Sequence, residues 1–105
     1  TSIYDNWASL NPEGIRYANS YQLAAFETDN AWFHGDSRVF VDPYSMSFPR
    51  EDRARIFEYA VLADSAHLFS SGTMQEKLRV ICSGIREAYD LTKSQEIFPW
   101  EQYLR

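Results

Sequence analysis

The pattern that most constrains this chain is a run of apolar residues between positions 74 and 88, spaced alternately four and three apart. The residues are Met74, Leu78, Ile81, Ile85 and Ala88. This spacing places side chains on one face of an α-helix, so it predicts a helix seated on a partner element. Its start has two interpretations, with either Ser71 as the N-cap or Thr73 and Glu76 as a capping box. Gly84 costs about 1 kcal/mol relative to alanine in a helix, so we expect a close packing contact there.

A second helix is expected from Pro49 to about Ala63. Proline suits a first helical turn, and Ser47 or Phe48 would then be the cap. The predicted buried face is wide, with one central stripe and apolar residues beside it. The central stripe is Ala54, Phe57 and Val61, and Ile56, Ala60 and Ala63 lie beside it.

The remaining segments predict smaller elements. A short helix is expected over residues 3–9, followed by a turn at Asn11-Pro12-Glu13-Gly14. Residues 31–41 have the β-branched and aromatic content of a minor β-hairpin. A short helix over residues 98–104 should dock its aromatic side chains on the body. The expected fold class is therefore mainly α, a small helical domain with two principal packed helices, a short C-terminal helix and a minor hairpin, all in one domain over residues 1–105.

Composition excludes some classes of function. The 105 residues contain 10 Lys and Arg against 15 Asp and Glu, a net charge of −5. Nucleic-acid binding needs clustered cations, so no nucleic-acid partner is expected. No apolar run approaches the roughly 20 residues that span a bilayer, so no membrane span is expected. The single cysteine, Cys82, lies in the apolar helical pattern, which favours a buried small hydrophobic side chain over a reactive thiol.

Two carboxylates open the helix at Pro49. Glu51 and Asp52 face the positive end of the helix dipole, and Arg55 is placed to pair with Glu51 and Glu58. This interpretation needs no ligand. The alternative is a zinc ligand in the first turn, but zinc needs three protein ligands. His34 and His67 lie far apart in the sequence, and neither belongs to a His-Glu-x-x-His pair.

Three segments together resemble a known family. They are Trp7-Ala8-Ser9-Leu10-Asn11-Pro12-Glu13-Gly14-Ile15-Arg16-Tyr17, then Phe40-Val41-Asp42-Pro43-Tyr44-Ser45-Met46-Ser47-Phe48-Pro49-Arg50-Glu51-Asp52-Arg53-Ala54, then the helix from about Ser71 through Met74-Gln75-Glu76-Lys77-Leu78. In this order they resemble the C-terminal half of a family of bacterial zinc metallopeptidases of the gluzincin type. In that family a His-Glu-x-x-His helix lies upstream, and a later Glu-Asp-x-Ala helix supplies the third zinc ligand. The resemblance implies that Glu51 is a metal ligand, with Asp52 and Tyr44 lining the site.

The histidine helix is missing from these residues, so the resemblance implies a C-terminal portion of a larger peptidase. Its partners would be the upstream His-Glu-x-x-His segment and a peptide or protein substrate. Zn²⁺ would bind in the full-length parent, and neither tight zinc binding nor activity is expected of this chain alone. The alternative hypothesis is a non-catalytic acidic helical module that binds another protein through Trp7, Trp32 or Trp100.

Overall fold

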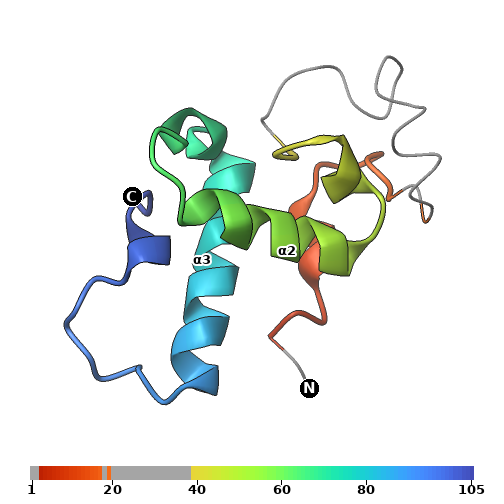
Figure 1. The fold of residues 1–105 in the computed structure, drawn as a ribbon. Coiled ribbons are helices and arrows are strands. Elements are labelled where there is room, and N and C mark those ends of the chain that lie inside the picture. The colour runs from red at the N-terminus through yellow and green to blue at the C-terminus, as the bar shows by residue number, and fades with distance from the viewer. Residues whose placement is uncertain (1–2, 18, 20–38) are drawn as a thin grey trace.

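The computed structural model describes residues 3–17, 19 and 39–105, and within them all regular structure is helical. Two α-helices, α2 (Pro49–Ala60) and α3 (Gly72–Ala88), cross each other, as Figure 1 shows. Four short 3-10 helices accompany them: η1 (Trp7–Leu10), η3 (Pro43–Met46), η4 (Ala66–Phe69) and η5 (Pro99–Glu101). The N-terminal segment lies on one side of α3 and η5 on the other. The mainly helical class with two packed helices is confirmed.

The expected β-hairpin finds no support in the described part of the chain. Residues 31–38 lie outside the described residues, and residues 39–41 form no strand. The C-terminal helix predicted over residues 98–104 is present over Pro99–Glu101, as η5, and Trp100 and Tyr103 of this segment pack against the core as predicted. The Tyr103 ring stacks on Phe69 with ring centroids 5.6 Å apart. None of the described helices is long and apolar enough to cross a lipid bilayer.

Helix α3 follows its sequence pattern closely. The Ser71 side chain accepts a hydrogen bond from the Met74 backbone N–H at 3.1 Å, so the first of the two predicted caps is the one formed. The residues of the predicted stripe are buried through Ile81, whereas Ile85 is half-buried and Ala88 is exposed. A Cβ atom at Gly84 would overlap the Tyr4 hydroxyl, which confirms the predicted close contact.

Helix α2 differs from its prediction in length and in orientation. It ends at Ala60 rather than at Ala63, and soon afterwards Asp64 adopts the left-handed conformation (φ 62°) that an α-helix cannot continue through. The buried face consists of Asp52, Ile56 and Ala60. The predicted central stripe was wrong, because Ala54, Phe57 and Val61 are exposed, as is Ala63. The pattern placed only apolar residues inward, while the real inward face begins with a carboxylate.

The N-terminal segment packs mainly through one side chain, Trp7. The short helix expected over residues 3–9 is instead a turn followed by η1, and Trp7 is buried with Ile56, Phe69 and Leu78 in the main core. The predicted turn at residues 11–14 is present. Its Gly14 has φ 89°, a conformation that favours glycine.

Arg86, in the last turn of α3, holds the C-terminal segment in place. Its guanidinium makes two hydrogen bonds to the Glu101 carboxylate, at 2.6 and 2.8 Å. It also donates to the backbone carbonyls of Leu91, Ser94 and Glu96 at 2.7–2.9 Å. Residues 91–98, which lack helix and strand, therefore obtain much of their order from one side chain.

Candidate functional site

Glu51 lies on the first turn of α2, where its side chain is 25% exposed. Its Oε1 atom accepts a hydrogen bond from Arg55 Nε at 3.3 Å. Arg55 Nη1 lies 3.3 Å from Glu58 Oε2 and 3.7 Å from Asp42 Oδ2. The predicted pairing of Arg55 with both glutamates is confirmed, and Asp42 adds a third carboxylate. Glu51 Oε2 accepts no hydrogen bond from the described residues.

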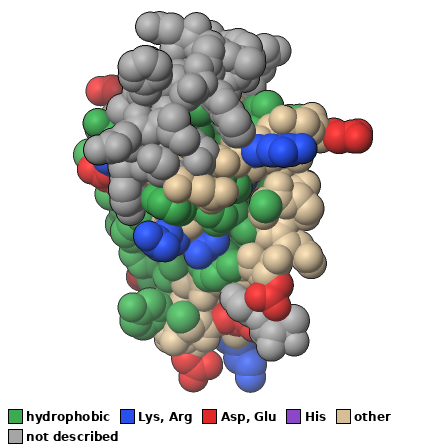
Figure 2. Space-filling view, turned by 90° about the vertical axis from the view of Figure 1, so that its right-hand side faces the viewer, with side chains coloured by type: hydrophobic (Ala, Val, Ile, Leu, Met, Phe, Trp, Pro, Cys, Tyr) green, Lys and Arg blue, Asp and Glu red, His purple; other side chains and the backbone are tan. Residues whose placement is uncertain are grey.

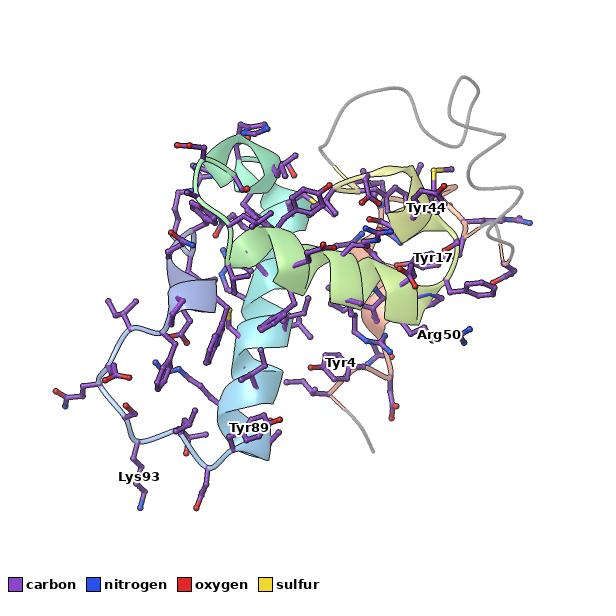
Figure 3. All side chains as sticks on the ribbon, viewed as in Figure 1. Tyr4, Tyr17, Tyr44, Arg50, Tyr89 and Lys93 are labelled. Carbon is purple, nitrogen blue, oxygen red and sulfur yellow. The ribbon has the colours of Figure 1, made fainter. Side chains whose placement is uncertain are left out.

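Tyr44 lies close to this cluster. It belongs to η3, directly before α2, and its ring is exposed (Figure 3). The Arg55 guanidinium lies 5.3 Å from the centroid of the Tyr44 ring. Arg55 thus contacts two of the residues singled out in the sequence, Glu51 and Tyr44, and holds them on one side of α2.

Asp52 points in the other direction, into the core, where it is fully buried. Three donors converge on its Oδ2 atom: the Tyr17 hydroxyl at 2.7 Å, Lys77 Nζ at 2.8 Å and Trp7 Nε1 at 3.2 Å. Trp7 Nε1 also donates to the Tyr17 hydroxyl at 2.9 Å, and Lys77 donates to the Val39 carbonyl at 2.7 Å. Asp52 Oδ1 is buried with no hydrogen-bond partner in the described part of the chain.

Burial dominates the electrostatics of this network. It raises the pKa of the Asp52 carboxyl, while the Lys77 charge and the three donors act in the opposite direction. Burial likewise lowers the pKa of the Lys77 ammonium against the attraction of Asp52. The pKa of Tyr17 is raised by burial and by the neighbouring Asp52 charge. Because neither Asp52 nor Lys77 is exposed to solvent, their contact joins α2 to α3 inside the protein.

The Asp52–Lys77 contact escaped the sequence analysis, although a signal for it is present. Lys77 falls between Met74 and Leu78 on the buried stripe of α3, and Asp52 precedes Ile56 by one helical turn on α2. Charged residues are almost never fully buried unless they are paired. Two opposite charges on the inward faces of two packed helices could therefore have predicted an internal ion pair.

The described residues do not complete a zinc site. No group of three or more His, Cys, Asp or Glu side chains within residues 3–17, 19 and 39–105 could hold a metal ion. His67 lies in η4 and is exposed, and His34 falls outside the described residues. Zinc sites use three or four protein ligands. Glu51 could supply one of them, and the others would have to come from elsewhere.

The remaining candidate residues are placed as follows. Cys82 is buried, as predicted, and burial raises its pKa to about 12. Trp7 is 2% exposed and is therefore not available to a partner, which contradicts its proposed role in binding. Trp32 lies outside the described residues. Trp100 is half-buried and forms part of a groove on the surface.

This groove has a volume of about 690 Å³ and opens between α2, α3 and the C-terminal segment. Its walls are mainly apolar and aromatic, and include Tyr4, Phe57, Ile85, Tyr89 and Trp100, with Arg53 as its charged residue. Figure 3 shows Tyr4 and Tyr89 on the same side of α3. Glu51 does not line the groove.

Comparisons of the chain with protein-family models, with curated proteins and with solved structures found no significant match. The resemblance to zinc metallopeptidases therefore stays a prediction. Function has to be inferred from the placement of Glu51, from the buried network beneath it and from the groove.

Proposed function

We propose that this chain is the C-terminal portion of a zinc-dependent metallopeptidase and that Glu51 is its third zinc ligand. The upstream His-Glu-x-x-His segment of the parent protein would supply the two imidazoles, and the substrate would be a peptide or protein. The observation that carries this proposal is the fixed placement of Glu51. The Glu51 carboxylate is partly exposed, and the next residue in the chain, Asp52, is held in the core by its contact with Lys77.

The buried network supports this role by holding the helix turn in place. A metal ligand works only if its oxygen stays within a fraction of an ångström of the required position. Asp52 is the next residue in the chain, and its Oδ2 is held by donors from three other segments. The backbone of the first turn of α2 therefore cannot shift independently of α3.

The contacts of Glu51 itself also fit a ligand. Carboxylates that bind metals are commonly hydrogen-bonded on their outer side, and loss of such a partner costs 10- to 100-fold in affinity or activity. Arg55 Nε donates a hydrogen bond to Oε1 of Glu51, while Oε2 accepts no hydrogen bond from the described residues. One oxygen is thus oriented by the protein and the other is available.

The test uses the full-length parent protein, with zinc content and peptide hydrolysis as measurements. Glu51→Gln should lose stoichiometric zinc and hydrolysis. Glu58→Gln is the matched control, because Glu58 pairs with the same arginine and is more exposed. The isolated chain should neither bind zinc tightly nor hydrolyse peptides. Full zinc occupancy and activity in the Glu51→Gln parent would refute the proposal.

A second candidate is a non-catalytic acidic helical module that binds another protein, and the apolar groove favours it. Of the three tryptophans suggested for such a role, Trp100 lies on the groove wall. The same pair of variants separates the candidates. An interaction module would respond equally to Glu51→Gln and to Glu58→Gln, since neither residue lines the groove.

A further inference from the structure

The groove between α2, α3 and the C-terminal segment has the size of a small-molecule site. Its volume of about 690 Å³ lies within the range of roughly 300–1,000 Å³ that is typical of such sites. The aromatic side chains on its walls come from four different segments: Tyr4 precedes η1, Phe57 belongs to α2, Tyr89 ends α3 and Trp100 belongs to η5. A molecule in the groove would therefore contact apolar side chains on several sides.

The wall that carries Trp100 is held in shape by the contacts of Arg86. Arg86 Nη1 donates a hydrogen bond to the Leu91 carbonyl at 2.9 Å, and Leu91 lines the groove. The same guanidinium pairs with Glu101, the residue directly after Trp100, at 2.6 Å. The Trp100 ring also lies against Phe57, with ring centroids 6.0 Å apart. Small-molecule sites are usually largely preformed, and these contacts fix one wall of the groove without a ligand.

Arg53 is the charged residue of the groove. Its guanidinium lies 4.7 Å from the centroid of the Tyr4 ring and 5.7 Å from that of the Trp7 ring, so it is held among aromatic side chains. Figure 2 shows Lys and Arg side chains among hydrophobic ones on the side of the molecule where α2 begins. Within the described part of the chain Arg53 has no hydrogen bond and no ion pair, whereas Arg55 and Arg86 both have carboxylate partners. Its N–H groups therefore suit a carboxylate, which can accept two of them at once.

We propose that the groove binds a small carboxylate with a planar aromatic body. Arg53 and Phe57 are four residues apart on α2, so their Cβ atoms lie about 5–6 Å from each other on one side of the helix. The carboxylate would accept hydrogen bonds from Arg53 while the rings lie against Phe57 and Trp100, since aromatic pairs are stabilised beyond their buried area. Glu51 does not line the groove, so this site is separate from the proposed zinc ligand and does not depend on it.

Titration calorimetry of the 105-residue chain with 2-naphthoate tests this proposal. The dissociation constant should be about 1 mM or lower, as expected for a ligand of this size. 2-Naphthylmethanol has the same rings without the charge and should bind about tenfold more weakly, because it cannot form the charge-assisted hydrogen bonds to Arg53. Octanoate, which has the carboxylate without the rings, should also bind more weakly. Equal affinity for any two of these compounds, or no binding of 2-naphthoate, would overturn the proposal.

Two variants separate the charge from the apolar contact. Arg53→Gln should weaken 2-naphthoate about tenfold and leave 2-naphthylmethanol unchanged. Phe57→Ala should weaken both compounds several-fold, and it should leave the fold intact because Phe57 is 38% exposed. Arg50→Gln is the matched control, since Arg50 is an exposed residue of α2 outside the groove (Figure 3). An equal loss of 2-naphthoate binding in Arg50→Gln and Arg53→Gln would indicate a general attraction of anions and would overturn the site.

NMR chemical shifts locate the bound compound. 2-Naphthoate should shift the signals of the Trp100 indole and the Ile85 methyl groups, which line the groove. Ile97 is the internal control, because it is 78% exposed and does not line the groove, and its signals should not move. Shifts confined to residues outside the groove would overturn the proposal. Shifts of the groove signals that grow with protein concentration in the absence of 2-naphthoate would identify a second copy of the chain as the occupant, and would overturn it as well.

Discussion

Replacing Lys77 by methionine tests how strongly the buried network holds the two helices together. Lys77 and Asp52 are both fully buried, with Nζ and Oδ2 2.8 Å apart. Methionine keeps most of the length and apolar volume of the side chain but removes the ammonium. The substitution therefore leaves the Asp52 carboxylate in the core with two donors, Tyr17 and Trp7, in place of three.

The expected cost is large. Removing one partner of a buried ion pair typically destabilises a protein by about 3–5 kcal/mol, because the other charge stays buried and uncompensated. Domains of this size have total stabilities of about 5–15 kcal/mol. The Val39 carbonyl also loses its donor, Lys77 Nζ. Lys77→Met should thus remove a large part of the free energy of unfolding.

Urea denaturation followed by tryptophan fluorescence measures this loss. With a slope of about 1–3 kcal/mol per molar urea, the midpoint should fall by at least about 1 M. A double-mutant cycle with Asp52→Leu separates the pair from its surroundings. The double variant should be clearly more stable than the sum of the two single losses implies, since it buries no unpaired charge.

Two results would refute this reasoning. A midpoint for Lys77→Met within experimental error of the wild-type value would mean that the pair contributes little to the fold. Additive losses in the cycle would mean that Asp52 and Lys77 act independently despite their contact. A substitution of Arg79, which pairs with Glu76 on the exposed face of α3 at 3.3 Å, is the control and should cost less than about 1 kcal/mol.

Three further predictions concern single contacts. Burial raises the pKa of the Cys82 thiol to about 12. The thiol should therefore react slowly with a disulfide reagent at pH 8 in the folded protein and fast in denaturant. Equal rates would contradict its burial. The hydrogen bond from Arg86 lowers the pKa of Glu101, so its contribution to stability is present above the unfolded pKa of about 4.3 and is lost as the pH falls through the lower folded pKa. Glu101→Gln should therefore flatten the pH dependence of the urea midpoint in this range, and an unchanged pH profile would exclude this contribution. Gly84→Ala should lose about 1–3 kcal/mol through overlap with the Tyr4 hydroxyl and regain about 1 kcal/mol of helix propensity, a net destabilisation of up to about 2 kcal/mol. Thermal melting measures this change, and Tyr4→Phe in the same chain should recover part of the loss.

Local signals in the sequence predicted the features that depend on neighbouring residues. The capping Ser71, the buried stripe of α3 and the pairing of Arg55 with two glutamates all involve partners within four residues. Gly84 is a partial exception, because its position within a helix indicated a close contact but did not identify Tyr4 as the neighbour. Such features follow from helix geometry alone, so they could be predicted without knowledge of the tertiary structure.

The features that sequence analysis missed depend on distant residues. The inward face of α2 is set by Asp52, whose partners Lys77, Tyr17 and Trp7 are 25, 35 and 45 positions away. A periodicity argument counts Asp52 as polar and turns the helix so that this residue faces solvent. The groove was missed for the same reason, because the side chains that the pattern placed inward, such as Phe57, form its wall.

The buried network also has a consequence for how the chain is made. Synthesis proceeds from the N-terminus at about 5–20 residues per second, so Trp7 and Tyr17 leave the ribosome several seconds before Lys77. Until Lys77 arrives, Asp52 has no cation to bury with it, and the aromatic N-terminal segment cannot take its final place. By contrast, Arg86 and its C-terminal partners emerge close together. Trp7 and Tyr17 are therefore secured only after Lys77 has been made, and a growing chain stalled before α3 would present these tryptophan and tyrosine side chains to chaperones.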